Sequence, residues 1–288
     1  MHLLKTYLMA TIAAIFWGAN FNLARPVIAE MGPYVAGASR YVLAALAMML
    51  IVWLRHTALS LTHWKAYLTL GVVGVFGFNL FFFLGMETSS AINGALIMAL
   101  NPLLTAILGY WMLGDRPSTQ QWIAFPVGIA GVAIVVLGAG AQLQIAVGDI
   151  YILTAAVNWA LYNVLVKKMM PKQVSGIANT TGIMTFGAMA LSTAALWHGD
   201  PVVIPTFHAG AALLTMSLGG GVLAYLFWNA SIAHLGPSKA AIFMNLVPVT
   251  TMLIAAIQHT PPSHAQWIGA ILVISAVTFS SVSLSKKA

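Results

Sequence analysis

The sequence predicts an all-α integral membrane protein with ten transmembrane helices, arranged as two inverted five-helix repeats around a central cavity. The first supporting observation is composition, because 60% of the 288 residues are hydrophobic and only 6% are charged. In a typical soluble domain, about 45–50% of the residues are apolar and about 25% are charged. The second observation is an internal repeat, since residues 84–138 and 231–281 follow one pattern in which Pro102 aligns with Pro248.

The predicted spans follow from the length of the apolar segments. A helix needs about 20 apolar residues to cross about 30 Å of hydrocarbon. Segments of this kind lie at 6–25, 33–54, 65–86, 91–113, 119–138, 148–168, 176–197, 209–232, 238–258 and 265–284. We interpret the first as a retained helix rather than a signal peptide, because no small-residue cleavage site follows it.

The repeat sets the domain organisation. Pro102 and Pro248 lie about half a chain length apart, so we predict two repeats at 1–142 and 143–288. Each repeat carries five predicted spans, and an odd number places the two repeats in opposite orientations. Inverted repeats of this kind are common in secondary transporters.

The basic residues predict the orientation. All Lys and Arg residues except Arg25 and Arg40 fall on the same side of the predicted topology as the N-terminus. The positive-inside rule makes that side, and both termini, cytoplasmic. The net charge of +7 is thereby explained without a nucleic-acid partner, because the basic residues form no single patch.

Several short motifs recur in an order that resembles the drug/metabolite transporter superfamily, specifically its EamA-type exporters. These motifs are Phe16-Trp17-Gly18-Ala19-Asn20, Arg40-Tyr41, Ser90-Ala91, Asn101-Pro102, Leu113-Gly114-Asp115, Gly236-Pro237-Ser238-Lys239-Ala240-Ala241 and Val247-Pro248. The family's usual Leu-Gly-Glu is Leu-Gly-Asp here, and the second half has His259-Thr260-Pro261 in its place. Because Asp115 has no counterpart, we assign it no catalytic or coupling role.

The resemblance implies an exporter of small molecules in the bacterial inner membrane. Members of this family move amino acids, other small metabolites or drugs out of the cell, and exporters of aromatic and other neutral amino acids are the most similar type. Efflux of drugs or other metabolites is the alternative. A monomer is plausible, and the sequence leaves the oligomeric state open.

Polar and aromatic residues deep in the spans are the candidates for substrate binding, because such residues usually face the bundle interior. They are Trp17, Asn20, Arg40, Phe78, Asn79, Phe82, Asn101, Trp159, Tyr162, Tyr225 and Asn245. A lining of rings and amides suits a neutral or zwitterionic solute with an apolar or aromatic side chain. The alternative is structural: rings also pack against helices or lipid, and buried amides also tie helices together.

Three residues within the spans, two prolines and an arginine, carry more specific expectations. Pro102 and Pro248 each remove a backbone hydrogen bond near mid-span, so each is either a static kink or a hinge for alternating access. Arg40 lies about seven residues into the second span. It either extends its side chain to the outer interface or holds a fixed charge that pairs with a substrate carboxylate or orders the outer gate.

Other classes of function lack the residues they need. No histidine spacing fits a metal site, and no Ser/His, paired Asp or zinc constellation lies at depth, so we predict neither an enzyme nor a metal or other cofactor. A transporter of sugar phosphates or nucleotide sugars needs a cluster of basic residues, whereas only Arg40 lies within a span. No carboxylate lies near the midplane, which favours passive, gradient-driven export.

Overall fold

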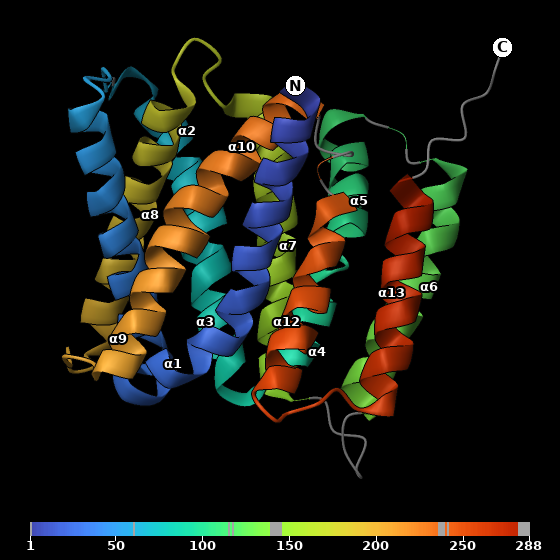
Figure 1. Ribbon diagram of the computed structural model, residues 1–288. Helices are drawn as coiled ribbons and strands as arrows, with labels where there is room; N and C mark the ends of the chain where they lie inside the picture. Colours follow the sequence, from blue (N-terminus) through green and yellow to red (C-terminus); the bar gives the residue numbers. More distant parts are fainter. Residues whose placement is uncertain are drawn as a thin grey trace, which may run out of the picture.

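The computed structural model describes residues 2–59, 61–114, 116, 118–138, 146–235, 240 and 242–281. These residues form a bundle of helices (Figure 1). The longest element, α1 (His2–Leu54), is two helices joined at Gly32, whose φ of 68° and ψ of 163° are not helical. Glycine tolerates this positive φ, and Pro33 then starts the second helix.

The remaining elements follow in the order that the hydropathy predicts. They are η1 (Leu61–His63), α2 (Trp64–Leu70), η2 (Gly71–Gly77), α3 (Phe78–Thr88), α4 (Ala91–Met98), α5 (Asn101–Leu113), α6 (Thr119–Gly138), α7 (Val147–Met169), α8 (Gly176–His198), α9 (Phe207–Leu214), η3 (Thr215–Leu223), α10 (Ala224–Leu235), η4 (Ile242–Asn245), α12 (Leu246–Ile257) and α13 (His264–Ser281). Each predicted range contains helix, and the segment between the first two predicted ranges is helical up to Gly32.

The described helices include several that are long and apolar enough to cross a membrane. They are Leu3–Leu54, Leu61–Thr88, Ala91–Leu113, Val147–Met169 and Phe207–Leu235, and shorter apolar helices lie at Trp122–Ile134, Phe243–Ile257 and His264–Ala276. Large apolar side chains cover the outside of the bundle, as Trp111, Leu196 and Trp197 show with exposures of 78%, 79% and 91%. Such a surface is suited to lipid and not to water. The protein is therefore an all-helical, multi-pass membrane protein.

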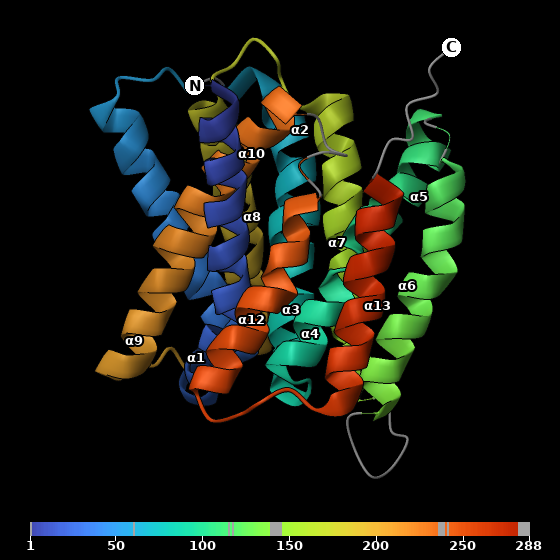
Figure 2. The same cartoon turned by 45° about the vertical axis from the view of Figure 1, so that its right-hand side comes forward.

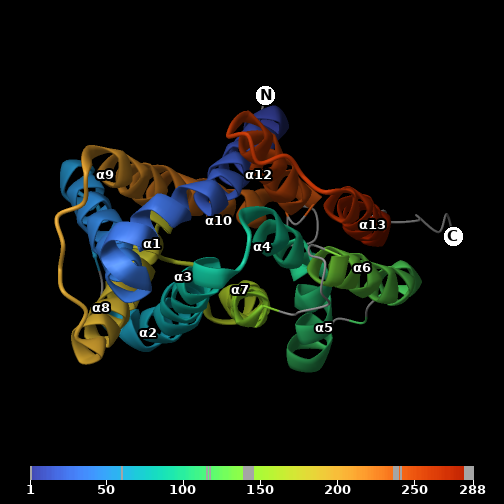
Figure 3. The same ribbon diagram turned by 90° about the horizontal axis from the view of Figure 1, so that it is seen from below.

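The helices form a main bundle with a flanking pair. α6 and α13 lie side by side at one edge (Figures 1 and 2). The view along the helices places α9, α8 and the second half of α1 at the opposite edge, with α3, α4, α7, α10 and α12 between (Figure 3). α1 begins and α13 ends at the same end of the molecule (Figure 1).

The two halves of the chain share two irregularities. The third predicted span contains the π-helix η2, and the eighth contains the π-helix η3. The fourth span is broken between α4 and α5, where Pro102 occupies the first turn of α5. The ninth changes from the 3₁₀-helix η4 to α12 just before Pro248. The kinks expected at the two prolines are thus breaks that lie immediately before them.

The broken helices interlock the halves. In α5, the Asn101 Nδ2 donates to the Ala156 carbonyl of α7 at 2.9 Å. In α12, the Thr251 Oγ1 donates to the Gly18 carbonyl of α1 at 2.8 Å, and the Asn22 Nδ2 donates back to the Thr251 carbonyl at 3.2 Å. Each broken helix is therefore bound to the first helix of the other half.

We predict that the end of the molecule where α1 begins is cytoplasmic. Gln173, in the exposed loop between α7 and α8, lies at that end, whereas Gln258, after α12, lies at the other. The chain has no cysteine, so single cysteines can be labelled without background. A membrane-impermeant maleimide added to intact cells should label Gln258→Cys but not Gln173→Cys. Labelling of Gln173→Cys alone would reverse the orientation.

Candidate functional site

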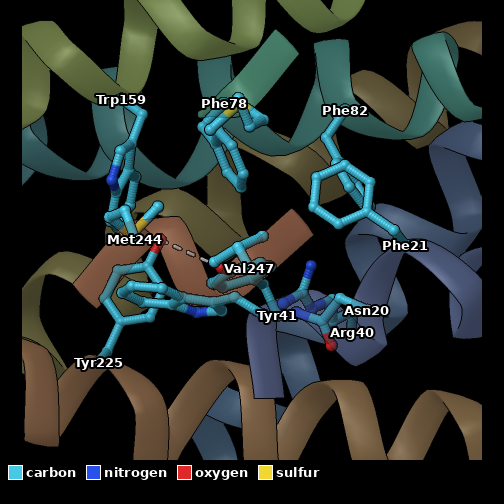
Figure 4. A pocket seen from close by; sticks show the side chains of 12 residues that line it. Asn20, Phe21, Arg40, Tyr41, Phe78, Phe82, Trp159, Tyr225, Met244 and Val247 are labelled. Carbon is cyan, nitrogen blue, oxygen red and sulfur yellow. Dashed lines mark hydrogen bonds between the residues drawn. The ribbon is translucent and has the colours of Figure 1, made fainter. Parts of the chain in front are cut away.

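A small cavity lies at the centre of the bundle, between the two halves (Figure 4). Its volume is about 30 Å³, which is room for one or two water molecules. Any larger solute requires the walls to move apart. The lining consists of Trp17, Asn20, Phe21, Arg40, Tyr41, Phe78, Phe82, Met98, Trp159, Tyr225, Met244 and Val247.

Trp17 is the centre of the aromatic lining. Its ring centroid lies 5.4 Å from that of Trp159, 6.1 Å from that of Tyr225 and 5.1 Å from that of Trp228, all edge to face. This geometry is the favoured one for aromatic pairs. Its Nε1 also donates to the Gly220 carbonyl at 2.9 Å. Trp17 therefore links α1 to α7, η3 and α10.

Phenylalanine rings from α1 and α3 form a second wall. The Phe78 ring lies 5.3 Å from that of Trp159 and 5.8 Å from that of Phe82, and the Phe82 ring lies 5.2 Å from that of Phe21. Figure 4 shows these rings on the opposite side of the cavity from Tyr225 and Arg40. Most of the cavity surface is therefore apolar and aromatic.

Arg40 provides the charge at this site. Its side chain is 2% exposed, so it lies inside the bundle and does not extend to the outer interface. Its Nε donates to the Met216 carbonyl at 3.3 Å, and its Nη1 donates to Asn79 Oδ1 at 3.0 Å. With the Asn20 amide oriented so that its oxygen faces the guanidinium, Nη2 donates to it at 2.8 Å. The Tyr41 ring centroid lies 5.2 Å from Cζ.

The described residues form no ion pair with Arg40. Its positive charge is therefore balanced by neutral oxygens and a ring face. A buried charge without a counter-charge is costly unless a further partner compensates it.

The side chains around the cavity also hold the two π-helices. Within η2, the Gly74 carbonyl accepts from the Tyr225 hydroxyl at 3.3 Å, and the Val75 carbonyl accepts from Asn79 Nδ2 at 2.8 Å. Within η3, the Met216 and Gly220 carbonyls accept from Arg40 and Trp17 as described above. π-helical turns occur frequently at functional sites, and here both are bonded to residues at or beside the cavity.

The structure brings most of the predicted site residues together. Seven line the cavity, namely Trp17, Asn20, Arg40, Phe78, Phe82, Trp159 and Tyr225. Four lie outside the lining. Asn79 supports Arg40, Asn101 bonds to α7, Tyr162 stacks on Trp159 with centroids 5.0 Å apart, and Asn245 Nδ2 donates to Thr278 Oγ1 at 3.1 Å.

Sequence reasoning missed five lining residues. They are Phe21, Tyr41, Met98, Met244 and Val247. Apolar residues of this kind look like packing residues in any span. One signal was present, because Met98 and Met244 align in the internal repeat.

The halves are also joined at the end of the molecule opposite the start of α1. Glu30 accepts hydrogen bonds from the Thr206 hydroxyl at 2.6 Å and from the Thr206 backbone N–H at 2.7 Å. These bonds, the hydroxyl bond above all, lower the pKa of the Glu30 carboxyl. Nearby, the Tyr34 and His198 rings stack 4.0 Å apart. These contacts join α1 to α8 and to the segment before α9.

Duplicated sets of membrane helices around a central site are a common plan of secondary transporters. Groups of three or more potential metal ligands are absent from the described residues. The chain belongs to the EamA-like transporter family, whose model matches residues 4–137 and 146–282. The two matches correspond to duplicated halves, and the protein is a transporter of small molecules and not an enzyme.

Individual relatives agree with this family. The chain is 38% identical over 293 residues to "Uncharacterized transporter YyaM" of Bacillus subtilis (strain 168), across 96% of this chain and 94% of that one. It is 25% identical over 283 residues to an "Uncharacterized transporter" of Archaeoglobus fulgidus, across 95% and 96%. A solved crystal structure with 19% identity matches with a TM-score of 0.73 over 95% of both chains. That likeness shows the fold alone.

Two neighbouring glycines of η3 test how closely the site is packed. A Cβ on Gly220 would lie 2.4 Å from the Asn20 amide, whereas a Cβ on Gly221 would lie 3.2 Å from its nearest neighbour, Ala44 Cβ. Gly220→Ala should therefore displace Asn20 from Arg40 and destabilise the protein by about 1–3 kcal/mol. Gly221→Ala should have a smaller effect. Thermal unfolding in detergent measures both, and equal shifts would contradict the packing described here.

Proposed function

We propose that this protein exports small metabolites, most notably amino acids including aromatic ones, from the bacterial cytoplasm by alternating access. The observation that carries this proposal is Arg40, a buried cation without an acidic partner among the described residues, which lines an otherwise aromatic cavity. This arrangement suits a solute that combines a carboxylate with an apolar or aromatic side chain.

Arg40 has the capacity to bind such a carboxylate. A guanidinium carries five N–H donors, of which Asn20, Asn79 and Met216 take three. The two remaining N–H groups of Arg40 have no acceptor within the described part of the chain. An arginine can hold a carboxylate through two parallel hydrogen bonds, and the anion supplies the missing counter-charge.

The aromatic rings fit the body of the solute. Trp17, Phe78, Trp159 and Tyr225 surround the cavity from both halves of the chain. Stacking between rings contributes about 0.5–1.5 kcal/mol beyond the burial of area. The present volume is too small for an amino acid, so binding needs the halves to separate on one side.

The two repeats supply the parts for this motion. We propose that ten spans, five in each of the units 1–142 and 143–288, cross the membrane with both termini in the cytoplasm. The helix breaks before Pro102 and Pro248 are the proposed hinges, because i→i−3 bonds such as that from the Leu100 N–H to the Ile97 carbonyl replace the α-helical pattern before Pro102, and the helix type changes before Pro248.

Export is proposed to follow the gradient of the solute. The cavity lining contains no carboxylate and no histidine. Asp149, which is buried near the start of α7, accepts a hydrogen bond from the Ser89 hydroxyl at 2.5 Å, away from the cavity. No titratable carboxyl group at the cavity is therefore available to couple export to protons.

Purified protein in liposomes provides the direct test. Liposomes loaded with a panel of amino acids should release aromatic and neutral ones down their gradient, with equal pH on both sides and a proton ionophore present. Release of none of the panel, or release only with a pH gradient, would contradict the proposal.

Arg40 variants test the role of the charge. Arg40→Lys keeps the charge but loses the planar guanidinium that holds two oxygens at once, so it should transport several-fold more slowly. Arg40→Leu should transport about tenfold more slowly or worse, because a hydrogen bond to a charged group is lost. Protein in the membrane is quantified in parallel. Wild-type transport by Arg40→Leu would remove the residue from the site.

Trp159 tests the aromatic contribution. Trp159→Ala should reduce kcat/KM for aromatic amino acids about fivefold, which corresponds to about 1 kcal/mol of ring stacking. Alanine and serine, as small solutes, should be affected less. Equal losses for aromatic and small solutes, at equal protein amounts, would indicate a packing role for Trp159.

A further inference from the structure

Two tyrosine hydroxyls are bonded to each other in the wall of the cavity. Tyr41 and Tyr225 both line the cavity, and both are buried. Their hydroxyl oxygens lie 3.2 Å apart, and Figure 4 draws the bond between them. Tyr41 belongs to α1 in the first half of the chain, and Tyr225 belongs to α10 in the second half. We call these two side chains the tyrosine pair.

The π-helix η2 sets the direction of the hydrogen bonds in the tyrosine pair. The Gly74 carbonyl of η2 lies 3.3 Å from the Tyr225 hydroxyl, and a carbonyl can only accept. Tyr225 therefore donates its one hydroxyl hydrogen to Gly74, and its oxygen accepts from the Tyr41 hydroxyl. Both hydroxyl hydrogens are used in this way, so the tyrosine pair presents only oxygen lone pairs to a ligand.

The other polar side chains of the lining leave few acceptors for a ligand. Asn20 carries the one further side-chain oxygen among the lining residues, and that oxygen accepts from Arg40 Nη2. The indole nitrogens of Trp17 and Trp159 can only donate. The oxygens of the tyrosine pair are therefore the acceptors that remain. They suit an ammonium group, which carries donors alone, whereas a carboxylate or carbonyl finds no free hydrogen there.

Arg40 restricts which ammonium compounds the tyrosine pair can bind. Its Cζ lies 5.2 Å from the Tyr41 ring centroid, and the two residues are consecutive in one helix, so they stay together when the halves separate. The guanidinium repels a solute that carries only a positive charge. A solute that also carries a carboxylate supplies the counter-charge. In an α-amino acid both groups are attached to one carbon, so they require neighbouring subsites of this kind.

We propose that the tyrosine pair, with Tyr41 as its fixed member, binds the ammonium group of an α-amino acid whose carboxylate is held by Arg40. This inference rests on the proposed function and narrows it, because it selects α-amino acids over plain carboxylic acids and plain amines. The side chain of the solute then extends toward the rings of Phe78 and Phe82, which lie across the cavity from Tyr225 and Arg40 (Figure 4).

Three compounds that share a phenyl ring test the ammonium subsite in the unmodified protein. Phenylalanine carries both charged groups, 3-phenylpropionate lacks the ammonium, and 2-phenylethylamine lacks the carboxylate. The two analogues are measured as inhibitors of phenylalanine transport in liposomes, because their uncharged forms cross bilayers unaided. The inhibition constant of each should exceed the KM for phenylalanine at least about tenfold, since a hydrogen-bonded charged group is missing. An inhibition constant of 3-phenylpropionate equal to that KM would overturn the subsite.

A pair of tyrosine variants tests the hydroxyl itself. Tyr41→Phe keeps the ring against Arg40 and removes the acceptor, so it should raise the KM for phenylalanine about tenfold. It should leave the inhibition constant of 3-phenylpropionate unchanged, because this analogue has no ammonium to lose. The matched control is Tyr67→Phe, a buried tyrosine outside the cavity lining whose hydroxyl donates to Asn179 Oδ1 at 3.0 Å. The control should keep both constants.

The outcomes separate this subsite from the proposed function. If phenylalanine is transported but Tyr41→Phe weakens phenylalanine and 3-phenylpropionate equally, the hydroxyl has a packing role and only the subsite is wrong. If the unmodified protein transports no amino acid, the proposed function is wrong and the subsite fails with it. The analogue panel needs no variant, so it decides the question even where Tyr41→Phe does not reach the membrane.

Discussion

The buried guanidinium of Arg40 is the interaction on which the centre of this transporter depends. It joins the second part of α1 to Asn20 in the first part of the same element, to Asn79 in α3 and to the Met216 carbonyl in η3. These partners come from both halves of the chain and are all uncharged. A cation held by dipoles alone is stable enough to fold but is still able to bind an anion, which a salt bridge to a fixed carboxylate would prevent.

The two π-helices give this interaction a mechanical consequence. Four of their carbonyls accept hydrogen bonds from Arg40, Trp17, Asn79 and Tyr225. Any ligand that binds Arg40, Trp17 or Tyr225 through the same donor competes with a backbone carbonyl of η2 or η3. Ligand binding and the geometry of the third and eighth predicted spans are therefore linked by shared donors. A ligand shifts a conformational equilibrium only through such differential contacts.

Hydropathy and the internal repeat were enough to predict the helical membrane fold, because both act over tens of residues. The π-helices were beyond sequence reasoning, since they depend on contacts between distant segments. A Cβ on Gly74 in η2 would lie 2.1 Å from the Tyr162 ring, and one on Gly219 in η3 would lie 2.4 Å from the Phe16 ring. At the site, Arg40 and the aromatic rings stood out as unusual in a span, whereas Met98 and Val247 did not. The role of Asn79 as a support for Arg40 required the distance between them.

The duplicated fold carries a site that is not duplicated. Among the described residues, the first half contributes the cation at the cavity, and the second half contributes the buried polar side-chain atoms that lack a hydrogen-bond partner. Trp17 and Trp159 occupy comparable depths in the two halves and show the same asymmetry. The Trp17 Nε1 donates to the Gly220 carbonyl, whereas the Trp159 Nε1 has no hydrogen-bond partner among the described residues. A symmetric cavity would present the same chemistry at both ends and would bind a solute in two opposite orientations. Under the proposed function, a charged end at Arg40 and an uncharged end at Trp159 orient the solute, so the asymmetry between the repeats is a source of specificity.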